Sequence, residues 1–405
     1  MIPFSPPHIN QEAIDEVIDT LKSGWITTGP KTKKFESELT EYCGNKSTLC
    51  VNSATFGLEL VLRWFGVGPG DEVIIPAYTY SATANVVVHT GATPVMADIN
   101  SSDFNISVAE IEKKISEKTK VIIPVDIAGL PADYEAIGKL VCKPEIIKIF
   151  NPTSDNQKKL GRILILSDAA HSFGATCKGK KTGNLTDITV FSFHAVKNLT
   201  TAEGGAIALN LDAPFDCFEE YKHFNTMSLH GQNKDALAKT QKGGWRYDIV
   251  DAGFKGNMTD IQSSLGLIAL KYYDSENLPV RKEIFNTYSK GFSSKKWAEL
   301  PIGSDYTRET SYHLYTLRIR DITENQRDQI IQLIFEQEIS VNVHFIPLPL
   351  HSAYKSRGYE MKNYPVSYDN YSREISLPVY QDLSLKNVNY IVETIVKIVD
   401  SFLKS

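Results

Sequence analysis

Short apolar runs alternate with amphipathic stretches through the first two thirds of the chain. Residues 12–22 place apolar side chains at helical spacing ahead of a glycine, which predicts a helix. Apolar runs rich in β-branched residues predict strands at STLCV (47–51), DEVIIP (71–76), TPVMADI (93–99), KVIIPV (120–125), RILILS (162–167), DITVFSF (187–193) and GGAIALN (204–210). Strands separated by helices in this way predict an α/β fold, in which helices cover both faces of a mostly parallel sheet.

The pattern changes after about residue 275. Strands are predicted at YHLYTLRIRD (312–321) and VNVHFIPL (341–348), and the helix ENQRDQIIQLIFEQE (324–338) separates them. We therefore expect a large domain over residues 1–274 and a smaller C-terminal α/β domain over residues 275–405.

Composition narrows the classes of function. A net charge of -5 without a basic block argues against nucleic-acid binding. No apolar stretch approaches the roughly 18 residues that suggest a membrane span, and the N-terminal residues lack the features of a secretion signal. Five widely spaced cysteines fit neither a disulfide framework nor a zinc site. We expect a cytoplasmic protein with free thiols and no metal.

Three polar residues lie at or shortly after the ends of predicted core strands. Asp126 follows VIIPV, Asp168 follows ILILS, and Lys197 follows TVFSF by a few positions. Taken alone, Lys197 would be a surface lysine on a loop. Ligands of parallel sheets bind beyond the carboxyl ends of the strands, so the co-location predicts a site instead.

A lysine and an aspartate at one sheet edge indicate a particular cofactor chemistry. A desolvated lysine becomes a free amine that can form a Schiff base with a carbonyl. An aspartate beside a heterocyclic nitrogen holds that nitrogen protonated. Pyridoxal 5'-phosphate needs both groups, which makes it the predicted cofactor of Lys197 and Asp168.

The phosphate of that cofactor has a candidate site at NSATFGLEL (52–60). Small polar residues there open an apolar helix, although an ordinary helix cap has the same pattern. Thr55 and the amides of Thr55 and Phe56 would face the phosphate, and the Ser192 hydroxyl would add a donor.

Two further residues are candidates for contacts with the cofactor ring. Tyr80 follows a predicted strand, and its ring would either cover the cofactor or pack in the core. His171 would either donate to the ring hydroxyl or be an ordinary core histidine. Metal-ligand histidine spacings, a dinucleotide-binding glycine motif and a P-loop are absent from the sequence.

These residues fall within an ordered set of motifs. The set is SGWITTGP (23–30), GPGDEVIIP (68–76), SATAN (81–85), GATPVMADI (91–99), SDAAHSFGA (167–175), FSFHAVKNLTTAEGGAI (191–207), GFKGNMTDIQSSLGLIAL (253–270), YHLYTLRI (312–319), VHFIPLPLH (343–351) and SLPVYQDLS (376–384). Nearly end to end, the chain resembles the DegT-type sugar aminotransferases, which are pyridoxal phosphate enzymes of fold type I.

The resemblance implies a role for each matching position. Lys197 would be the Schiff-base lysine and Asp168 the partner of the ring nitrogen. The remaining cofactor positions would be Thr55, Phe56 and Ser192 at the phosphate, Tyr80 on the ring face and His171 near the ring hydroxyl. Asn257 would reach the phosphate of a neighbouring subunit, which implies a homodimer with shared active sites. The segments lining the sugar-nucleotide pocket would contribute Thr27, Thr28, His313 and His344.

The reaction implied by the resemblance is a two-step amine transfer. L-Glutamate would donate its amino group, and a 4-keto sugar nucleotide would accept it, with Lys197 moving the proton. The closest subgroup makes 4-amino sugars on UDP, so we expect a UDP-linked 4-keto-6-deoxy-hexose or 4-keto-pentose for lipopolysaccharide, capsule or glycan assembly. The alternatives are a dTDP-keto sugar, a keto-cyclitol, or a non-catalytic regulator that binds the cofactor.

The chain departs from the family pattern at two places. Residues 142–162 are polar, contain prolines and are expected to form an exposed insertion. Gly256 replaces a larger residue, and we expect this change to reshape the substrate side of the pocket.

Overall fold

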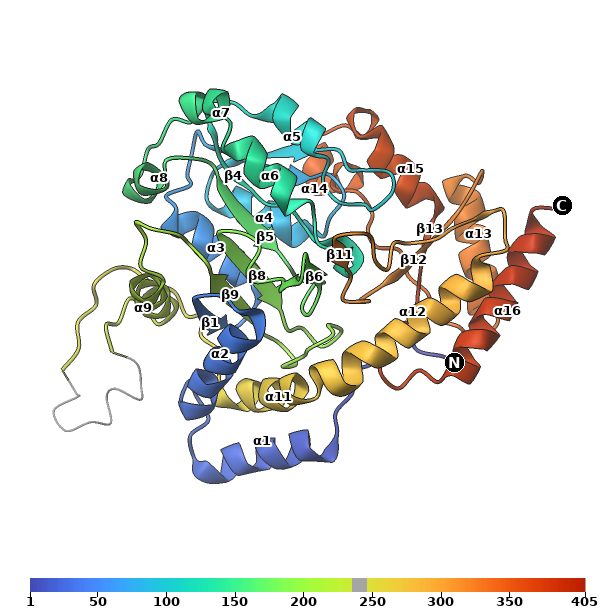
Figure 1. The fold of residues 1–405 in the computed structure, drawn as a ribbon, viewed down its shortest axis with the longest axis horizontal. Helices are drawn as coiled ribbons and strands as arrows, with labels where there is room; N and C mark the ends of the chain where they lie inside the picture. The colour runs from blue at the N-terminus through green and yellow to red at the C-terminus, as the bar shows by residue number, and fades with distance from the viewer. Residues whose placement is uncertain (235–245, 405) are drawn as a thin grey trace.

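A computed structural model describes residues 1–234 and 246–404 of the chain (Figure 1). The helices are α1 (Gln11–Ser23), α2 (Pro30–Cys43), α3 (Ala54–Trp64), α4 (Ser81–His89), α5 (Val108–Lys114), α6 (Tyr134–Val141), α7 (Pro144–Ile149), α8 (Asp155–Leu160), α9 (Cys217–Ser228), α11 (Asp260–Lys271), α12 (Leu278–Phe292), α13 (Glu324–Phe335), α14 (Ser352–Lys355), α15 (Pro365–Arg373) and α16 (Leu385–Phe402). Short 3-10 or π turns are η1 (Ile127–Gly129), η2 (Tyr273–Asn277), η3 (Leu348–Leu350) and η4 (Met361–Asn363). The strands are β1 (Ser47–Val51), β2 (Glu72–Pro76), β3 (Thr93–Ala97), β4 (Thr119–Ile122), β5 (Leu164–Asp168), β6 (Thr176–Cys177), β7 (Lys180–Lys181), β8 (Ile188–Ser192), β9 (Gly205–Leu209), β10 (Ala298–Glu299), β11 (Arg308–Glu309), β12 (Tyr315–Ile319) and β13 (Glu374–Leu377).

Seven strands form the large sheet, in the order β1-β9-β8-β5-β4-β2-β3. Strands β8, β5, β4, β2 and β3 pair in parallel, whereas β9 runs antiparallel to both of its neighbours. The predicted α/β fold with a mostly parallel sheet is confirmed. Since β5 and β8 are parallel neighbours, their carboxyl ends lie at the same edge of the sheet.

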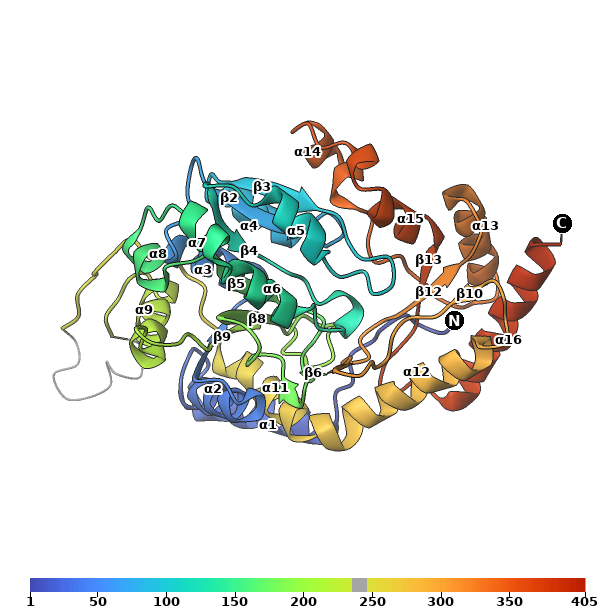
Figure 2. The ribbon, with the colours of Figure 1, turned by 45° about the horizontal axis from the view of Figure 1, so that its top comes forward.

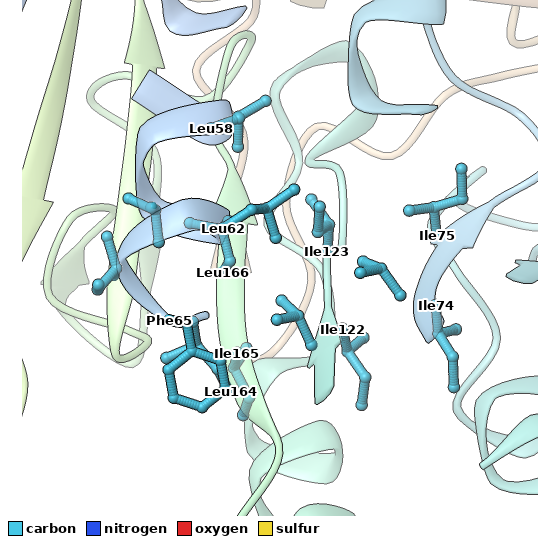
Figure 3. Packing of buried hydrophobic residues seen from close by; sticks show 14 of the residues in the cluster. Leu58, Leu62, Phe65, Ile74, Ile75, Ile122, Ile123, Leu164, Ile165 and Leu166 are labelled. Carbon is cyan, nitrogen blue, oxygen red and sulfur yellow. The ribbon is translucent and has the colours of Figure 1, made fainter. Parts of the chain in front are cut away.

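Alternate side chains of the strands enter two different hydrophobic clusters. Along β8, Val190 belongs to the cluster under α3, and Phe191 belongs to the cluster under α2 and α11. In Figure 3, Leu58 and Leu62 of α3, and Phe65 directly after this helix, lie in one cluster with the apolar side chains of β5, β4 and β2. Complete burial of an aliphatic side chain such as Leu62 contributes about 1.5–3 kcal/mol. The sheet is therefore held from both faces.

Helix α1 confirms the helix predicted at residues 12–22, and its ends follow from local chemistry. The Asn10 side chain accepts a hydrogen bond from the Ala13 N–H at 2.9 Å, which caps the first turn. Gly24 ends the helix in the left-handed conformation, with φ of 73°. Helix α1 packs on α11, and α11 packs on α2, below the large sheet (Figure 1).

The C-terminal part has its own three-stranded sheet, in the order β10-β12-β13. The long helix α12 leads from α11 to this sheet, where α13 and α16 pack (Figure 2). The predicted helix at 324–338 is confirmed by α13. The strand predicted at VNVHFIPL (341–348) is wrong, because only Asn342 bridges to the sheet, at Ser376. Pro347 and Pro349 lack the N–H groups that a strand needs.

Two sets of contacts cross the predicted division of the chain at residue 274. Ile2 pairs with Ile339 and packs against the C-terminal cluster, and the N-terminus accordingly lies beside that part in Figure 2. Leu348 and Tyr354, in contrast, pack in the cluster of the large sheet. The division at residue 274 stays a prediction.

Most residues of the segment 142–162 are exposed, as its composition suggests, and the segment forms α7 and α8. Among its polar residues, Gln157 is the exception, because its side chain is fully buried. The Gln157 side chain donates to the Phe65 carbonyl at 2.9 Å, and Ser154 donates to the same oxygen at 2.8 Å. These polar side chains cap the open carbonyl end of α3, so their polarity serves packing rather than solvation. Among the described residues, no helix is long and apolar enough to span a membrane.

Candidate active site

The ends of β5 and β8 bring most of the predicted residues into one cavity. Asp168 ends β5, Ser192 ends β8, and Lys197 lies one short turn beyond. All three line a cavity of about 380 Å³ beyond the sheet edge. That volume lies within the range of small-molecule sites, about 300–1,000 Å³.

Asp168 is buried and held in a fixed orientation. The Thr83 hydroxyl donates to one carboxylate oxygen at 2.8 Å, and the Ala170 N–H donates to the other at 3.3 Å. Burial raises the pKa of Asp168, whereas these two donors and the charge of Lys197 oppose the rise. The donors stabilise the ionised carboxylate, which is the form that can hold a proton on a ring nitrogen.

Lys197 lies in an environment that disfavours its charge. Burial lowers the pKa of its amine to about 8, and the Asp168 carboxylate limits the shift. A larger fraction of free amine is therefore present near neutral pH than in a solvated lysine, as nucleophilic and general-base chemistry requires.

The N-terminus of α3 forms the floor beside these residues. The Ser53 hydroxyl accepts from the Phe56 N–H at 3.1 Å and caps the helix, while Thr55 lines the cavity. Gly205 of β9 permits this approach, because a Cβ there would lie 2.6 Å from the Ala54 nitrogen. The pattern NSATFGLEL (52–60) thus forms an ordinary helix cap, and the N-terminus of the same helix lies at the cavity.

Two buried imidazoles stand against each other in the cavity wall. The rings of His171 and His313 lie 4.5 Å apart, and Phe345 stacks on His171 at 5.6 Å. Burial lowers the pKa of both histidines well below the ordinary value, so both are neutral. Asn198 donates to the Ser311 carbonyl through its amide nitrogen. Its side-chain oxygen, 2.8 Å from His313 Nδ1, therefore accepts a hydrogen bond from Nδ1–H. Nδ1 of His171 is buried and has no hydrogen-bond partner within residues 1–234 and 246–404.

His344 lines the opposite wall of the cavity, and its ring is hydrogen-bonded to a residue of β13 that does not line the cavity. Its Nδ1 lies 3.0 Å from the Ser376 hydroxyl, which donates to Glu374 at 2.5 Å. Burial lowers the pKa of His344 to about 4 and raises that of Glu374 to about 8. Phe4, from the N-terminal segment, stacks on the His344 ring at 5.5 Å.

Through the hydrogen bonds of Ser376, the protonation state of Glu374 influences which ring nitrogen of His344 carries the proton. When Glu374 is ionised, Ser376 donates to it and must accept from Nδ1–H of His344. Nε2 of His344 is then a hydrogen-bond acceptor.

Asp126, the third residue at a strand end, stands behind the cavity. It accepts from the hydroxyls of Tyr134 and Ser172, each at 2.5 Å, and from the Ala132 N–H at 2.8 Å. Ser172 follows His171, so Asp126 braces the segment that carries His171 rather than contacting a ligand.

The remaining predicted residues lie at the rim or outside this cavity. Tyr80 lines the cavity but is 63% exposed. Asn257 donates to the Thr28 hydroxyl at 2.6 Å, and Asp260 donates through its N–H to the Thr27 carbonyl. Thr27, Thr28 and Asn257 thus form a group of their own, and none of them lines the cavity of this chain.

Phe56 and Gly256 also lie outside the cavity. A Cβ on Gly256 would lie 2.1 Å from the Phe56 ring, so that ring fills the space of the missing side chain. The expectation that Gly256 reshapes the substrate side of the pocket stays a prediction. The Phe56 amide is occupied by Ser53, and its role at a phosphate stays a prediction.

The residues present fit pyridoxal phosphate. The cavity offers an amine of lowered pKa, a buried carboxylate, a helix N-terminus and an unpaired imidazole nitrogen on His171. Within the described part of the chain, no group of three histidine, cysteine or acidic residues is placed to hold a metal ion.

Sequence reasoning missed the residues that orient the predicted ones. Thr83 lies inside the SATAN motif, where only its place at the start of a helix after β2 hints at a contact with Asp168. Ser376 and Glu374 alternate along β13, and such alternation alone cannot indicate that their side chains meet His344.

The comparisons with known proteins agree with this geometry. The model of the DegT/DnrJ/EryC1/StrS aminotransferase family matches residues 7–396. The spore coat polysaccharide biosynthesis protein SpsC of Bacillus subtilis is 36% identical over 402 residues, covering 98% of this chain and 97% of SpsC.

Solved structures are similar over the same length. Spr1654 of Streptococcus pneumoniae, named as a sugar aminotransferase, superposes in its PMP-form with a TM-score of 0.95 at 48% identity, covering 99% of this chain and 100% of that one. Its PLP-form gives 0.94 at 46% identity, covering 99% of each chain. Helicobacter pylori PseC, an aminotransferase involved in the biosynthesis of pseudoaminic acid, gives 0.85 at 29% identity, covering 99% of each chain. The chain belongs to the DegT/DnrJ/EryC1/StrS aminotransferase family, and its cofactor is pyridoxal phosphate.

Proposed function

We propose that this protein transfers the amino group of L-glutamate to a 4-keto sugar carried on UDP, for the assembly of a bacterial surface glycan. The single observation that carries the amine-transfer chemistry is the pair Lys197 and Asp168, which line one cavity at neighbouring strand ends. The sugar acceptor is supported by the names of SpsC, Spr1654 and PseC, which refer to polysaccharide, sugar and pseudoaminic acid chemistry.

Each residue of the cofactor end would have one task. Lys197 would hold the cofactor through its amine and then carry the proton between substrate carbon and cofactor. Asp168, kept ionised by Thr83, would hold a proton on the ring nitrogen. Thr55, Ser192 and the N-terminus of α3 would bind the phosphate. When bound, pyridoxal phosphate supplies an electron sink for the broken C–H bond.

The opposite wall would recognise the sugar. His313 and His344 are neutral imidazoles, and Nδ1 of each is hydrogen-bonded to a fixed partner, Asn198 or Ser376. A neutral imidazole can donate a hydrogen bond to a hydroxyl group or accept one from it, and it has no charge that would attract a charged ligand. That property suits a sugar ring better than a carboxylate.

A second copy of the chain would complete the site. Thr27, Thr28 and Asn257 lie together outside the cavity of their own chain, where a neighbouring subunit can meet them. Next to them, α1 exposes an apolar stripe in which Ile14, Ile18 and Leu21 are 43%, 40% and 54% exposed. A contiguous apolar surface of this kind is typical of a subunit interface.

Spectra and products test the amine transfer. The purified protein should be yellow, and L-glutamate should convert it to the pyridoxamine form with release of 2-oxoglutarate. UDP- and dTDP-linked 4-keto sugars and keto-inositols are then offered separately to that form. Return of the yellow colour with a UDP-keto sugar alone supports the proposal. A response only to dTDP sugars or only to cyclitols overturns the acceptor, and a protein without any turnover would be a cofactor-binding regulator.

Mixing two inactive variants tests the shared site. Lys197→Ala and Asn257→Ala damage different parts of a shared site, so a mixed dimer would contain one intact site and one doubly damaged site. Random mixing should restore about one quarter of the wild-type activity. Mixtures as inactive as the separate variants would place both residues in one subunit's own site.

A further inference from the structure

Arg281 is a buried arginine without an anionic partner. Three arginines of the described residues are buried, namely Arg281, Arg318 and Arg327. Arg318 pairs with Glu299 and Arg327 with Asp328, each at 2.7 Å. Arg281, 4% exposed on α12, forms no ion pair with any described residue.

The contacts of Arg281 are made to neutral groups only. Its Nε donates to the Asn277 side-chain oxygen at 2.8 Å, and Nη1 donates to the Val379 carbonyl at 3.0 Å. Burial lowers the pKa of Arg281 to about 10, so the guanidinium still carries its charge at neutral pH. An uncompensated buried charge is expensive, and proteins normally pair it.

A small cavity lies beside this guanidinium. Its volume is about 50 Å³, and its lining includes Arg281, Asn277, Gln381, the N-terminal segment with Asn10, and the turn with Lys197 and Asn198. A single ordered water needs about 10–15 Å³ by the same measure, so the cavity has room for a small ion with its remaining water. It is much too small for an amino acid or a phosphorylated sugar.

One carboxylate stands at the rim of the cavity. Glu276 is exposed and forms no ion pair with Arg281, and no carboxylate contributes to the pKa of the guanidinium. The positive charge is therefore still unpaired.

We propose that the cavity beside Arg281 binds one small monovalent anion, with chloride as the natural ligand. The anion would accept hydrogen bonds from the guanidinium and from side-chain amides in the wall, and it would neutralise the one buried cation that lacks a protein partner among the described residues.

The site lies where it can influence the active-site cavity. Asn277, which accepts from Arg281, donates to the Asn198 carbonyl and to the Gln381 side chain, each at 3.1 Å. Asn198 follows Lys197 and holds His313. An anion at Arg281 would thus help to hold the turn that carries Lys197.

Bromide gives a direct test with the complete, cofactor-loaded protein. Crystals grown without chloride and soaked in sodium bromide should give an anomalous peak within hydrogen-bond distance of the Arg281 guanidinium. Bromide found only at exposed lysines, a cavity filled by water alone, or Glu276 turned inward onto Arg281 would each overturn the proposal.

Thermal unfolding gives a second test in solution. At equal ionic strength, the melting temperature in chloride should exceed that in gluconate by about 1–2 °C once chloride is ten times its Kd. Arg281→Gln should abolish that difference, because glutamine keeps hydrogen-bond donors but not the charge. Lys282→Gln, which changes an exposed neighbour paired with Glu309, should keep it.

The two measurements together decide the proposal. The same chloride effect in Arg281→Gln would overturn it. If that variant does not fold, the bromide experiment on the wild-type protein still decides.

Discussion

The two ends of the active-site cavity are built from the chain in different ways. The cofactor end takes Asp168, Ser192 and Lys197 from two neighbouring strands within residues 168–197. The opposite wall takes Phe4 and His344 from segments that lie far apart in the sequence. The groups proposed for catalysis are thus fixed by one rigid sheet, whereas the wall proposed to recognise the sugar depends on long-range packing. Chemistry and substrate choice can therefore change independently, and the following experiments separate them.

The most damaging change breaks the cofactor end at its centre. Lys197→Ala removes the group that we propose moves the proton, so 2-oxoglutarate formation from L-glutamate should fall by about 10³-fold or more. Lys178→Ala is the matched control, because Lys178 is exposed and pairs only with Glu135. Retention of more than a tenth of the activity would contradict the role of Lys197.

The acidity of the same amine gives the next largest effect. Below its pKa of about 8, each pH unit reduces the free amine of Lys197 tenfold, so reactivity must rise with pH. In the cofactor-free protein, reductive modification of Lys197 by benzaldehyde should rise about 50-fold between pH 6 and pH 8 and level off above pH 9. Peptide mass spectrometry measures the rate.

Two controls establish the cause of that pH dependence. Asp168→Asn removes an anion that favours the charged amine, so the midpoint should move to lower pH. Lys178, whose pKa is raised by Glu135, should remain unmodified throughout this range. A midpoint near pH 10 for Lys197 would mean that its environment is not desolvated.

A substitution in β9 should weaken cofactor binding without removing a polar side chain. Gly205→Ala places a Cβ 2.6 Å from the Ala54 nitrogen and 2.7 Å from the Ser53 carbonyl carbon, and neither backbone atom can yield easily. Overpacking of this kind costs about 1–3 kcal/mol, and the displaced α3 N-terminus should weaken cofactor binding about tenfold.

Equilibrium titration with pyridoxal phosphate measures that affinity. Gly138→Ala is the control, because a Cβ at this glycine meets open space. Unchanged affinity in Gly205→Ala would show that α3 can shift without loss of the phosphate contact.

The smallest effect should come from a change in the opposite wall, which we propose recognises the sugar. Ser376→Ala removes the hydroxyl that orients His344, and a hydrogen bond of this kind contributes about 1 kcal/mol, or about fivefold. We expect the KM for the keto sugar to rise about fivefold while the glutamate half-reaction is unchanged.

Thr316 provides the control for that experiment. It pairs with Ser376 across the sheet, and its buried hydroxyl has no hydrogen-bond partner among the described residues. Thr316→Val should therefore leave both half-reactions unchanged. A loss in the glutamate half-reaction of Ser376→Ala would mean that the two ends of the cavity are not independent.

The sequence predicts the cofactor end better than the wall for a physical reason. Lys197 and Asp168 follow apolar strands of a parallel sheet, and that topology alone brings their ends together. Glu374 and Ser376 meet His344 only because His344 lies in a segment that leaves the regular sheet, which the apolar pattern of residues 341–348 conceals.

Polar composition does not show which polar side chains are buried. Most of the segment 142–162 is exposed as its composition predicts, yet Gln157 and Ser154 bind the open carbonyl end of α3. A polar side chain that replaces a backbone partner cannot be distinguished from an exposed one without knowledge of the neighbouring helix.

The pairing of Ile2 with Ile339 has a consequence for the order of folding. Ile2 leaves the ribosome long before its partner is synthesised, so Phe4 cannot take its place against His344 until most of the chain exists. The large sheet can form earlier, because its strands all precede residue 210. Growing chains would therefore present the lysine and the phosphate site in an open half-cavity, and the enclosure that excludes water would be the last part of the protein to assemble.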